Sequence, residues 1–397
     1  MTKEKSTVPR LRFPGFTDAW KQRKLGEVSK RVTRRNKELI SSLPLTISAQ
    51  HGLVDQEEFF NKQVASKDVS SYYLIKKGEF AYNKSYSNGY PWGAIKRLDR
   101  YEMGVLSTLY IVFKPTSLIC SDYLVSYYDT VNWYKEVSMI AAEGARNHGL
   151  LNIAPNDFFK TRLFIPTLPE QEAIGSFFSD LDQLITLHQR KLDDVKELKK
   201  ALLQKMFPKG NGNDFPELRF PEFTDAWKQR KLGEVSKRVT RRNKELISSL
   251  PLTISAQHGL VDQEEFFNKQ VASKDVSSYY LIKKGEFAYN KSYSNGYPWG
   301  AIKRLDRYEM GVLSTLYIVF KPTSLICSDY LVSYYDTVNW YKEVSMIAAE
   351  GARNHGLLNI APNDFFKTRL FIPTLPEQEA IGSFFSDLDQ LITLHQR

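Results

Sequence analysis

Basic side chains crowd into a short stretch near the start of the chain. Residues 21–37 hold one acidic residue, Glu27, among eight basic ones: Lys21, Arg23, Lys24, Lys30, Arg31, Arg34, Arg35 and Lys37. Lysine and arginine neutralise phosphates, and arginine or asparagine can also hydrogen-bond to the edges of bases. The stretch therefore predicts contact with a polyanion. A solvated surface loop with incidental charge is the alternative.

Two further stretches mix polar groups that suit the same chemistry. Residues 83–90 combine a lysine, serines, asparagines and tyrosines, and Arg146-Asn147-His148 lies between Gly144 and Gly149. Each stretch also has a purely structural interpretation. The first would be a hairpin whose tyrosine rings pack locally, and the second a turn in which His148 is hydrogen-bonded.

The chain is a tandem duplication. Residues 11–190 recur as residues 218–397, and the two copies differ at one position, Gly15 against Glu222. A repeat of this length duplicates whole domains rather than a solenoid unit. The candidate nucleic-acid contacts therefore occur twice, as Arg31, Arg34, Arg35, Lys84, Ser87, Asn88, Arg97, Arg146, Asn147 and His148 and as Arg238, Arg241, Arg242, Lys291, Ser294, Asn295, Arg304, Arg353, Asn354 and His355.

Composition bounds the class of protein. The 397 residues are 42% hydrophobic and 25% charged, as in ordinary globular domains. There is no apolar run of about 18 residues, so we expect no membrane span. Residues 1–10 lack the apolar core of a signal peptide, and two cysteines support neither a disulfide framework nor a zinc site. We expect a cytoplasmic protein. The net charge is +10, but neither copy is strongly basic as a whole. The concentration of basic residues in 21–37 and 228–244 is therefore the stronger argument for a nucleic-acid partner.

Sequence motifs for catalysis are absent. We find no phosphate-binding loop, no dinucleotide-binding glycine pattern, no H-E-x-x-H and no nucleophile elbow. The tetrapeptide Asn-Pro-Pro-Tyr or Asp-Pro-Pro-Tyr of amino-methyltransferases is also missing. The sequence therefore predicts no catalytic residue, no metal site and no cofactor in this chain.

The elements that position these residues follow from periodicity. Each copy begins with a β-rich part, with strands expected at residues 43–48, 72–75, 79–83, 93–98 and 105–113 and a helix at 122–137, and the apolar run 163–165 closes it. This pattern predicts an α+β domain with a curved sheet.

A long helix follows each β-rich part. From Pro169 to Met206, residues at heptad spacing form an apolar seam, interrupted by two polar positions: Ile174, Phe178, Leu181, Ile185, His188, Leu192, Val195, Lys199, Leu202 and Met206. A helix of 38 residues is about 57 Å long and needs a partner. The expected partner is its own duplicate at residues 376–397, which lacks the equivalents of residues 191–206. We expect His188 to set the register of the pair rather than to bind metal.

The order of β-rich domains and long helices, together with two short motifs, resembles the specificity subunit (HsdS) of Type I restriction–modification enzymes. The resemblance rests on the opening Trp20-Lys-Gln-Arg-Lys-Leu-Gly-Glu-Val28, on Leu168-Pro169-Glu170-Gln171 before the long helix, and on the repetition of both. It covers essentially the whole chain.

The resemblance implies two target-recognition domains, residues 1–166 and 218–373, and two helices conserved in the family, residues 167–207 and the shortened 374–397, with a linker at 208–217. In such subunits each domain reads half of a bipartite DNA site, and the helices pair antiparallel to set the spacer. Two methyltransferase subunits and two motor–nuclease subunits assemble on them. S-adenosylmethionine, ATP and Mg²⁺ are then expected on those partners.

Members of this family carry two different target-recognition domains, whereas the two domains of this chain are nearly identical. The chain should therefore read an interrupted palindrome, and substitution of Arg34, Arg35, Arg241 and Arg242 by alanine should weaken DNA binding. The alternative is a scaffold that uses its heptad helices without DNA. A self-sufficient nuclease or methylase is a third interpretation, against which the missing motifs argue.

Overall fold

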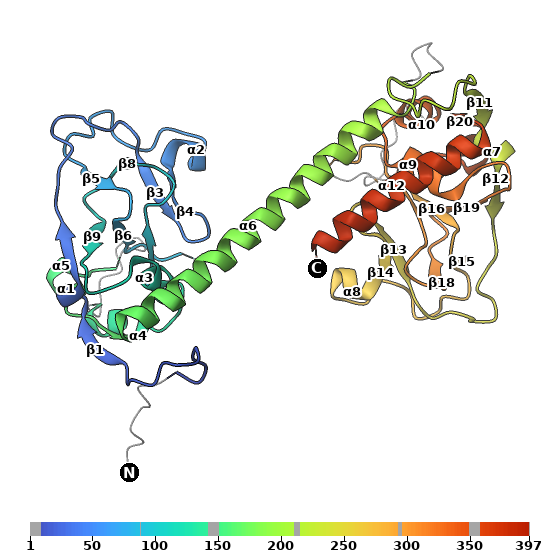
Figure 1. Cartoon of the computed structure of the whole chain (residues 1–397). Helices are drawn as coiled ribbons and strands as arrows, with labels where there is room; N and C mark the ends of the chain where they lie inside the picture. The colour runs from blue at the N-terminus through green and yellow to red at the C-terminus, as the bar shows by residue number, and fades with distance from the viewer. Residues whose placement is uncertain are drawn as a thin grey trace. The chain divides into compact units, whose positions relative to one another are not determined.

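Two compact units make up the chain, Met1–Thr186 and Leu187–Arg397. The computed structural model describes residues 9–87, 89–141, 151–209, 215–292, 296–348 and 358–396. The long helix α6 (Leu168–Lys205) belongs to the first unit up to Thr186 and to the second from Leu187 (Figure 1).

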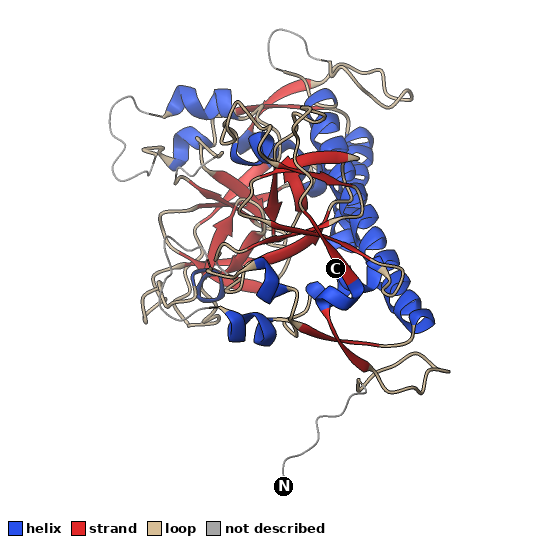
Figure 2. Ribbon diagram, turned by 90° about the vertical axis from the view of Figure 1, so that its left-hand side faces the viewer, coloured by secondary structure: helices blue, strands red, loops and turns tan. Residues whose placement is uncertain are grey.

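The first unit consists of short strands with a few short helices between them (Figures 1 and 2). Its elements before α6 are β1 (Lys21–Lys24), α1 (Leu25–Val28), β2 (Ser29–Val32), β3 (Leu45–Ser48), β4 (Gly52–Asp55), α2 (Gln56–Phe60), β5 (Tyr73–Lys76), β6 (Phe80–Asn83), β7 (Ala94–Arg97), β8 (Met103–Leu106), β9 (Ile111–Pro115), α3 (Ser121–Tyr128), α4 (Tyr134–Ile140), α5 (Pro155–Phe158) and β10 (Arg162–Ile165).

The second unit repeats this order after the last turns of α6. Its elements are β11 (Lys228–Lys231), α7 (Leu232–Val235), β12 (Ser236–Val239), β13 (Leu252–Ser255), β14 (Gly259–Asp262), α8 (Gln263–Phe267), β15 (Tyr280–Lys283), β16 (Phe287–Asn290), β17 (Ala301–Arg304), β18 (Met310–Leu313), β19 (Ile318–Pro322), α9 (Ser328–Tyr335), α10 (Tyr341–Ile347), α11 (Pro362–Phe365), β20 (Arg369–Ile372) and α12 (Leu375–Gln396).

Antiparallel pairing organises the strands of each unit. A four-stranded sheet with the order β2-β9-β6-β7 is accompanied by the pairs β1-β10, β3-β4 and β5-β8, and the second unit has the same set. The α+β class and the two repeated β-rich domains expected from the sequence are confirmed. Each domain contains several small sheets rather than one continuous sheet.

Two elements that the sequence predicts as continuous are broken. The expected strand 105–113 is split into β8 and β9 by a turn in which the Tyr110 amide donates to the Ser107 carbonyl over 3.1 Å. The expected helix 122–137 is split into α3 and α4, because the Thr130 hydroxyl donates to the Tyr127 carbonyl over 2.8 Å at the end of α3. Such local side-chain bonds compete with continued secondary structure.

Stacked aromatic side chains fill the larger core of each unit. Phe80 of β6 stacks on Phe113 of β9 at 5.3 Å between ring centroids, and Tyr82 stacks on Phe158 of α5 at 4.9 Å. Side chains from the four-stranded sheet therefore bind the short helices to one face of that sheet.

A buried carboxylate fixes the start of each long helix. Glu170 is fully buried and accepts bonds from the Arg12 guanidinium at 2.6 and 2.7 Å and from the Trp20 indole at 3.4 Å. Its neighbour Gln171 accepts from the Cys120 amide at 2.8 Å and donates to the Pro166 carbonyl at 3.0 Å. The Pro-Glu-Gln sequence thus attaches α6 to the N-terminal segment, to β10 and to the start of α3.

Close approach of α6 to α3 depends on Gly175. A Cβ atom at this position would lie 2.7 Å from the Tyr123 amide nitrogen and 2.8 Å from Asp122 Cβ. Gly382 of α12 meets α9 in the same way. A side chain at either position would therefore push the long helix off its domain.

The last turns of α6 pack inside the second unit, where they run antiparallel to α12 (Figure 1). His188 faces His395 at a centroid distance of 5.9 Å, and Lys199 bonds to Asp389 at 2.7 Å and to Asp336 at 3.1 Å. Burial by itself lowers the Lys199 pKa, but attraction to the two carboxylates outweighs it and raises that pKa above its ordinary value. Phe207, 1% exposed, lies against Tyr330 at 5.5 Å and Phe385 at 6.2 Å.

The predicted heptad seam is therefore divided. Leu192 and Met206 are buried within the second unit, whereas Phe178, Leu181 and Ile185 are 45%, 40% and 59% exposed.

The same phenylalanine should contribute unequally to stability in the two copies. Phe385→Ala removes a fully buried ring and should cost about 3–5 kcal/mol, whereas Phe178→Ala removes a half-exposed ring and should cost less than about 1 kcal/mol. Denaturant unfolding of the full chain, followed by circular dichroism, measures both. Equal shifts of the unfolding midpoint would contradict this assignment of the core.

Candidate nucleic-acid interface

The basic segment, residues 21–37, is mostly secondary structure rather than loop. Its first four residues form β1, all exposed and paired with β10, and Lys30 and Arg31 are exposed on β2, an edge strand of the four-stranded sheet. The buried residues Leu25 and Val28 anchor the segment between these strands. The segment thus holds its cations on a fixed backbone, and residues 228–244 repeat it.

A like-charge pair lies across β2 and β9. The register places Lys30 directly opposite Lys114, and both side chains are exposed. Lys237 and Lys321 form the equivalent pair in the second unit. Like charges at opposed positions are unfavourable in the free protein and become favourable next to an anion. Lys114 was not among the predicted residues, because only the strand register reveals its neighbour.

Arg31 and Arg238 are the predicted residues best placed to bind a phosphate. Both are exposed, and within the described parts of the chain neither makes a hydrogen bond or ion pair. Their guanidinium donors are therefore open to an external acceptor.

Arg34 and Arg35 are partly used within the fold. Arg34 bonds to Glu79 at 2.9 Å and to the Leu74 carbonyl at 3.0 Å, and Arg35 lies over the Tyr73 ring at 4.6 Å and donates to the Ser71 carbonyl. Arg241 and Arg242 repeat these contacts with Glu286 and Tyr280. These arginines attach each basic segment to β5 or β15 and to the glutamate that precedes β6 or β16, while staying one-third exposed or more.

Lys84 and Arg97 lie in more enclosed surroundings. Burial lowers the pKa of Lys84, which donates to the Ile153 carbonyl over 3.3 Å. Arg97 bonds to Asp99 at 2.6 Å and to Asp122 at 2.7 Å. Ser87 forms a bridge with Tyr90 at the tip of the loop. Lys291 and Arg304 repeat the first two environments.

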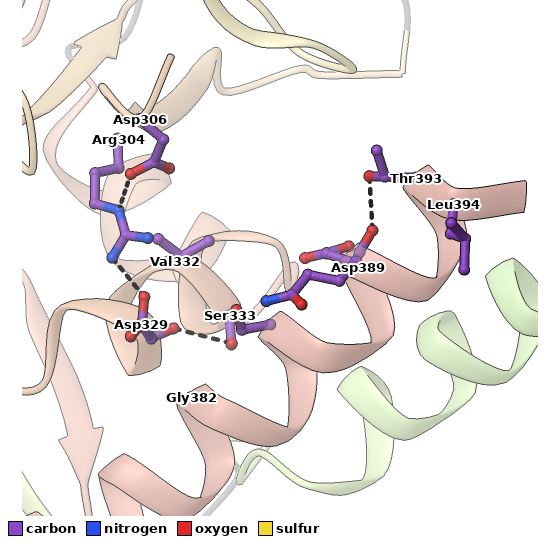
Figure 3. Close-up of a pocket in the computed structure, with 11 residues that line it drawn as sticks. Arg304, Asp306, Asp329, Val332, Ser333, Gly382, Asp389, Thr393 and Leu394 are labelled. Atoms are coloured by element: carbon purple, nitrogen blue, oxygen red, sulfur yellow. Dashed lines mark hydrogen bonds and ion pairs between the residues drawn. The ribbon is translucent and has the colours of Figure 1, made fainter. Parts of the chain in front are cut away.

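Figure 3 shows the Arg304 environment in the second unit. Its guanidinium lies between Asp306 and Asp329 at 2.6 and 2.7 Å, beside a cavity of about 400 Å³ that Asp389 and Thr393 of α12 also line. Two carboxylates neutralise this arginine, so its guanidinium donors are less open to an external acceptor than those of Arg238.

Nine predicted residues lie outside the described residues: Asn88, Arg146, Asn147, His148, Ser294, Asn295, Arg353, Asn354 and His355. All the predicted contacts remain predictions. The basic segment brings Arg31, Arg34 and Arg35 together, whereas Lys84 directly follows β6 and Arg97 ends β7 of the four-stranded sheet.

Metal-binding clusters and membrane-crossing helices are both absent from the described ranges. There, no group of histidine, cysteine, aspartate and glutamate has the arrangement needed to hold a metal ion. In the same part of the chain, no helix combines the length and apolar character needed to cross a membrane.

Similarity to known proteins is limited at the level of sequence. No family model matches the chain. A stretch of 134 residues is 24% identical to the Type I restriction enzyme MjaVIII specificity subunit of Methanocaldococcus jannaschii. The match covers 33% of this chain and 30% of that protein, so it spans less than a third of the relative's length.

Similarity of structure extends over nearly the whole chain. The crystal structure of the Type I restriction–modification S subunit from M. genitalium matches with a TM-score of 0.54 and 13% identity, over 98% of this chain and 94% of that one. The HsdS subunit from Thermoanaerobacter tengcongensis matches with a TM-score of 0.45 and 15% identity, over 99% and 93%. The resemblance indicated by the sequence is confirmed, and the chain has the fold of HsdS, the specificity subunit of Type I restriction–modification systems.

Proposed function

We propose that the chain is the DNA-reading specificity subunit of a Type I restriction–modification complex. The observation that carries the proposal is the likeness to an S subunit over 98% of the chain, including both β-rich domains and both long helices. The exposed cations of the basic segment support it, because Lys30, Arg31 and Lys114 have their charge directed to solvent.

Each domain reads one half of a bipartite site in this proposal. Residues 11–166 and 218–373 differ only at Gly15 and Glu222, which precede β1 and β11, so every residue of the strands is the same in both domains. Identical readers must prefer the same bases. The target is therefore one half-site repeated in inverted orientation, an interrupted palindrome.

The chain supplies recognition, and its partners supply chemistry. Two methyltransferase subunits would bind S-adenosylmethionine and methylate DNA, and two motor–nuclease subunits would use ATP and Mg²⁺. The long helices would set the spacer between half-sites and dock the methyltransferases. The cytoplasmic setting belongs to the same proposal, because the target DNA lies there.

A protein scaffold without DNA binding is the second candidate. It is favoured by the apolar side chains that α6 exposes in the first unit, including Phe177, Leu184 and Ile185 at 50%, 50% and 59% exposure. Duplex binding separates the two candidates, since a scaffold would show no dependence on DNA sequence and no steep dependence on salt.

Selection from a pool of random duplexes tests the proposed target. The full chain with its methyltransferase subunits should enrich one short sequence in two inverted copies at a fixed spacing. Identical domains cannot produce two different half-sites. Sequencing of the enriched duplexes measures this, and two unrelated half-sites would overturn the proposal.

Removal of exposed cations tests the interface. Lys30→Gln, Arg31→Gln, Lys237→Gln and Arg238→Gln remove four charges that make no ion pair in the described parts of the chain. Affinity for the selected duplex should fall at least about tenfold, and the slope of log affinity against log salt should fall by about 0.9 for each phosphate that is no longer neutralised. Fluorescence anisotropy across a salt series measures both.

A matched control removes the same charge elsewhere. Lys62→Gln, Lys67→Gln, Lys269→Gln and Lys274→Gln also neutralise four exposed lysines, which follow the C-terminal ends of α2 and α8. These changes should alter affinity much less. Equal effects of both sets would show that net charge, rather than the basic segment, drives binding.

A further inference from the structure

A short loop at the end of the basic segment presents an apolar pair to solvent in each unit. In the first unit this tip loop is residues 36–41, where Leu39 and Ile40 are 59% and 55% exposed. In the second unit the equivalents Leu246 and Ile247 are 59% and 56% exposed. Two adjacent aliphatic side chains at such exposure add little to the core of either unit.

One buried side chain closes the tip loop. The Asn36 side chain is fully buried; it donates to the Ser41 carbonyl over 2.8 Å and accepts from the Ser41 backbone N–H over 3.2 Å. The Leu39 backbone N–H donates to the Asn36 carbonyl over 2.8 Å, and the Asn36 backbone N–H donates to the Tyr72 carbonyl over 3.0 Å. The same bonds recur in the second unit. The tip loop is therefore held by an asparagine and by the backbone, independently of the two apolar side chains.

The backbone at the tip suits other residues better than leucine. Leu39 and Leu246 have φ values of 51° and 50°, in the left-handed region that glycine and asparagine adopt readily. A leucine in this conformation is strained. The side chain thus neither fills the core nor relaxes the turn, and it is available for a contact outside the chain.

Charge next to the apolar pair indicates which partner fits it. Arg35 and Lys37 precede the pair in the chain, and both are exposed. A partner of this surface must therefore offer negative charge close to an apolar group. The major groove of duplex DNA does so, because phosphates border it and the thymine methyl is the apolar group among its base edges.

We propose that Leu39 and Ile40, and their equivalents Leu246 and Ile247, contact thymine methyl groups in the major groove. Each domain then requires an A·T pair at a defined position of its half-site. Because the tip loops are identical, the pair occupies the same position in both half-sites. The inference rests on the proposed function and adds to it one of the bases that each domain reads.

Deoxyuridine in place of thymine is the direct probe, because it removes only the methyl group of the base. The full chain with its methyltransferase subunits should bind the selected duplex more tightly than the same duplex with deoxyuridine throughout both half-sites. The expected loss is about fourfold for each contacted methyl group, and thus more than about tenfold when each half-site loses one. Fluorescence anisotropy measures both affinities.

A variant of the tip loops assigns the methyl contact to these side chains. The four changes are Leu39→Gly, Ile40→Ala, Leu246→Gly and Ile247→Ala. All four side chains are exposed and glycine relaxes the left-handed backbone, so the variant should unfold thermally at or above the midpoint of the parent. Its affinity for the thymine duplex should fall more than about tenfold, and it should no longer distinguish thymine from deoxyuridine, which completes a double-mutant cycle.

A matched control changes equally exposed apolar side chains elsewhere. Met139→Ala and Met346→Ala truncate side chains of 62% and 56% exposure on α4 and α10. This variant should bind both duplexes as the parent does.

Four results would overturn the proposal. The selected half-site contains no A·T pair, the parent binds both duplexes equally, or the tip-loop variant keeps the full preference for thymine. In the fourth, the variant loses its methyltransferase subunits in sedimentation without DNA, which would make the tip loop a protein contact. These results leave the proposed function standing, whereas a parent complex that selects no sequence would overturn both.

Discussion

A buried carboxylate at the start of each long helix is the constraint on which the rest of the fold depends. Glu170 and Glu377 are fully buried, and each must keep its arginine partner, Arg12 or Arg219, because an unpaired buried charge is very unfavourable. The pair joins the N-terminal segment, the tryptophan that precedes the first strand and the helix start. The pair therefore fixes the start of each helix on its own domain.

Because the chain is a duplication, its two units show how one sequence folds in two surroundings. The same side chains fold to the same strands and to most of the same ion pairs in both units, as Arg34 with Glu79 and Arg241 with Glu286 show. The larger differences in burial arise where another segment adds contacts, as the last turns of α6 do in the second unit. Burial of a residue such as Phe385 is therefore a property of its neighbours in space and not of its local sequence.

Elements with a clear apolar pattern could be predicted closely, including the strands expected at residues 72–75, 79–83 and 93–98, which are β5, β6 and β7. Elements whose exposed residues carry charge could not. The heptad pattern predicted the helix at residues 169–206, against Leu168–Lys205 observed. Strands β1 and β2 were missed because their exposed residues are lysine, glutamine and arginine, which carry no alternating apolar signal. Among site residues, the basic segment was visible from composition. The engagement of Arg97 by two aspartates and the opposition of Lys30 and Lys114 depend on tertiary contacts and strand register.

The central claim is that two identical domains read two identical half-sites. Its most direct test is to scramble one half of the selected duplex at a time and to measure the affinity of the full chain, with its methyltransferase subunits, for each. We expect the same reduction in affinity whichever half is scrambled, and a much larger reduction when both are. A reduction confined to one half, with the other half free to vary, would contradict the claim.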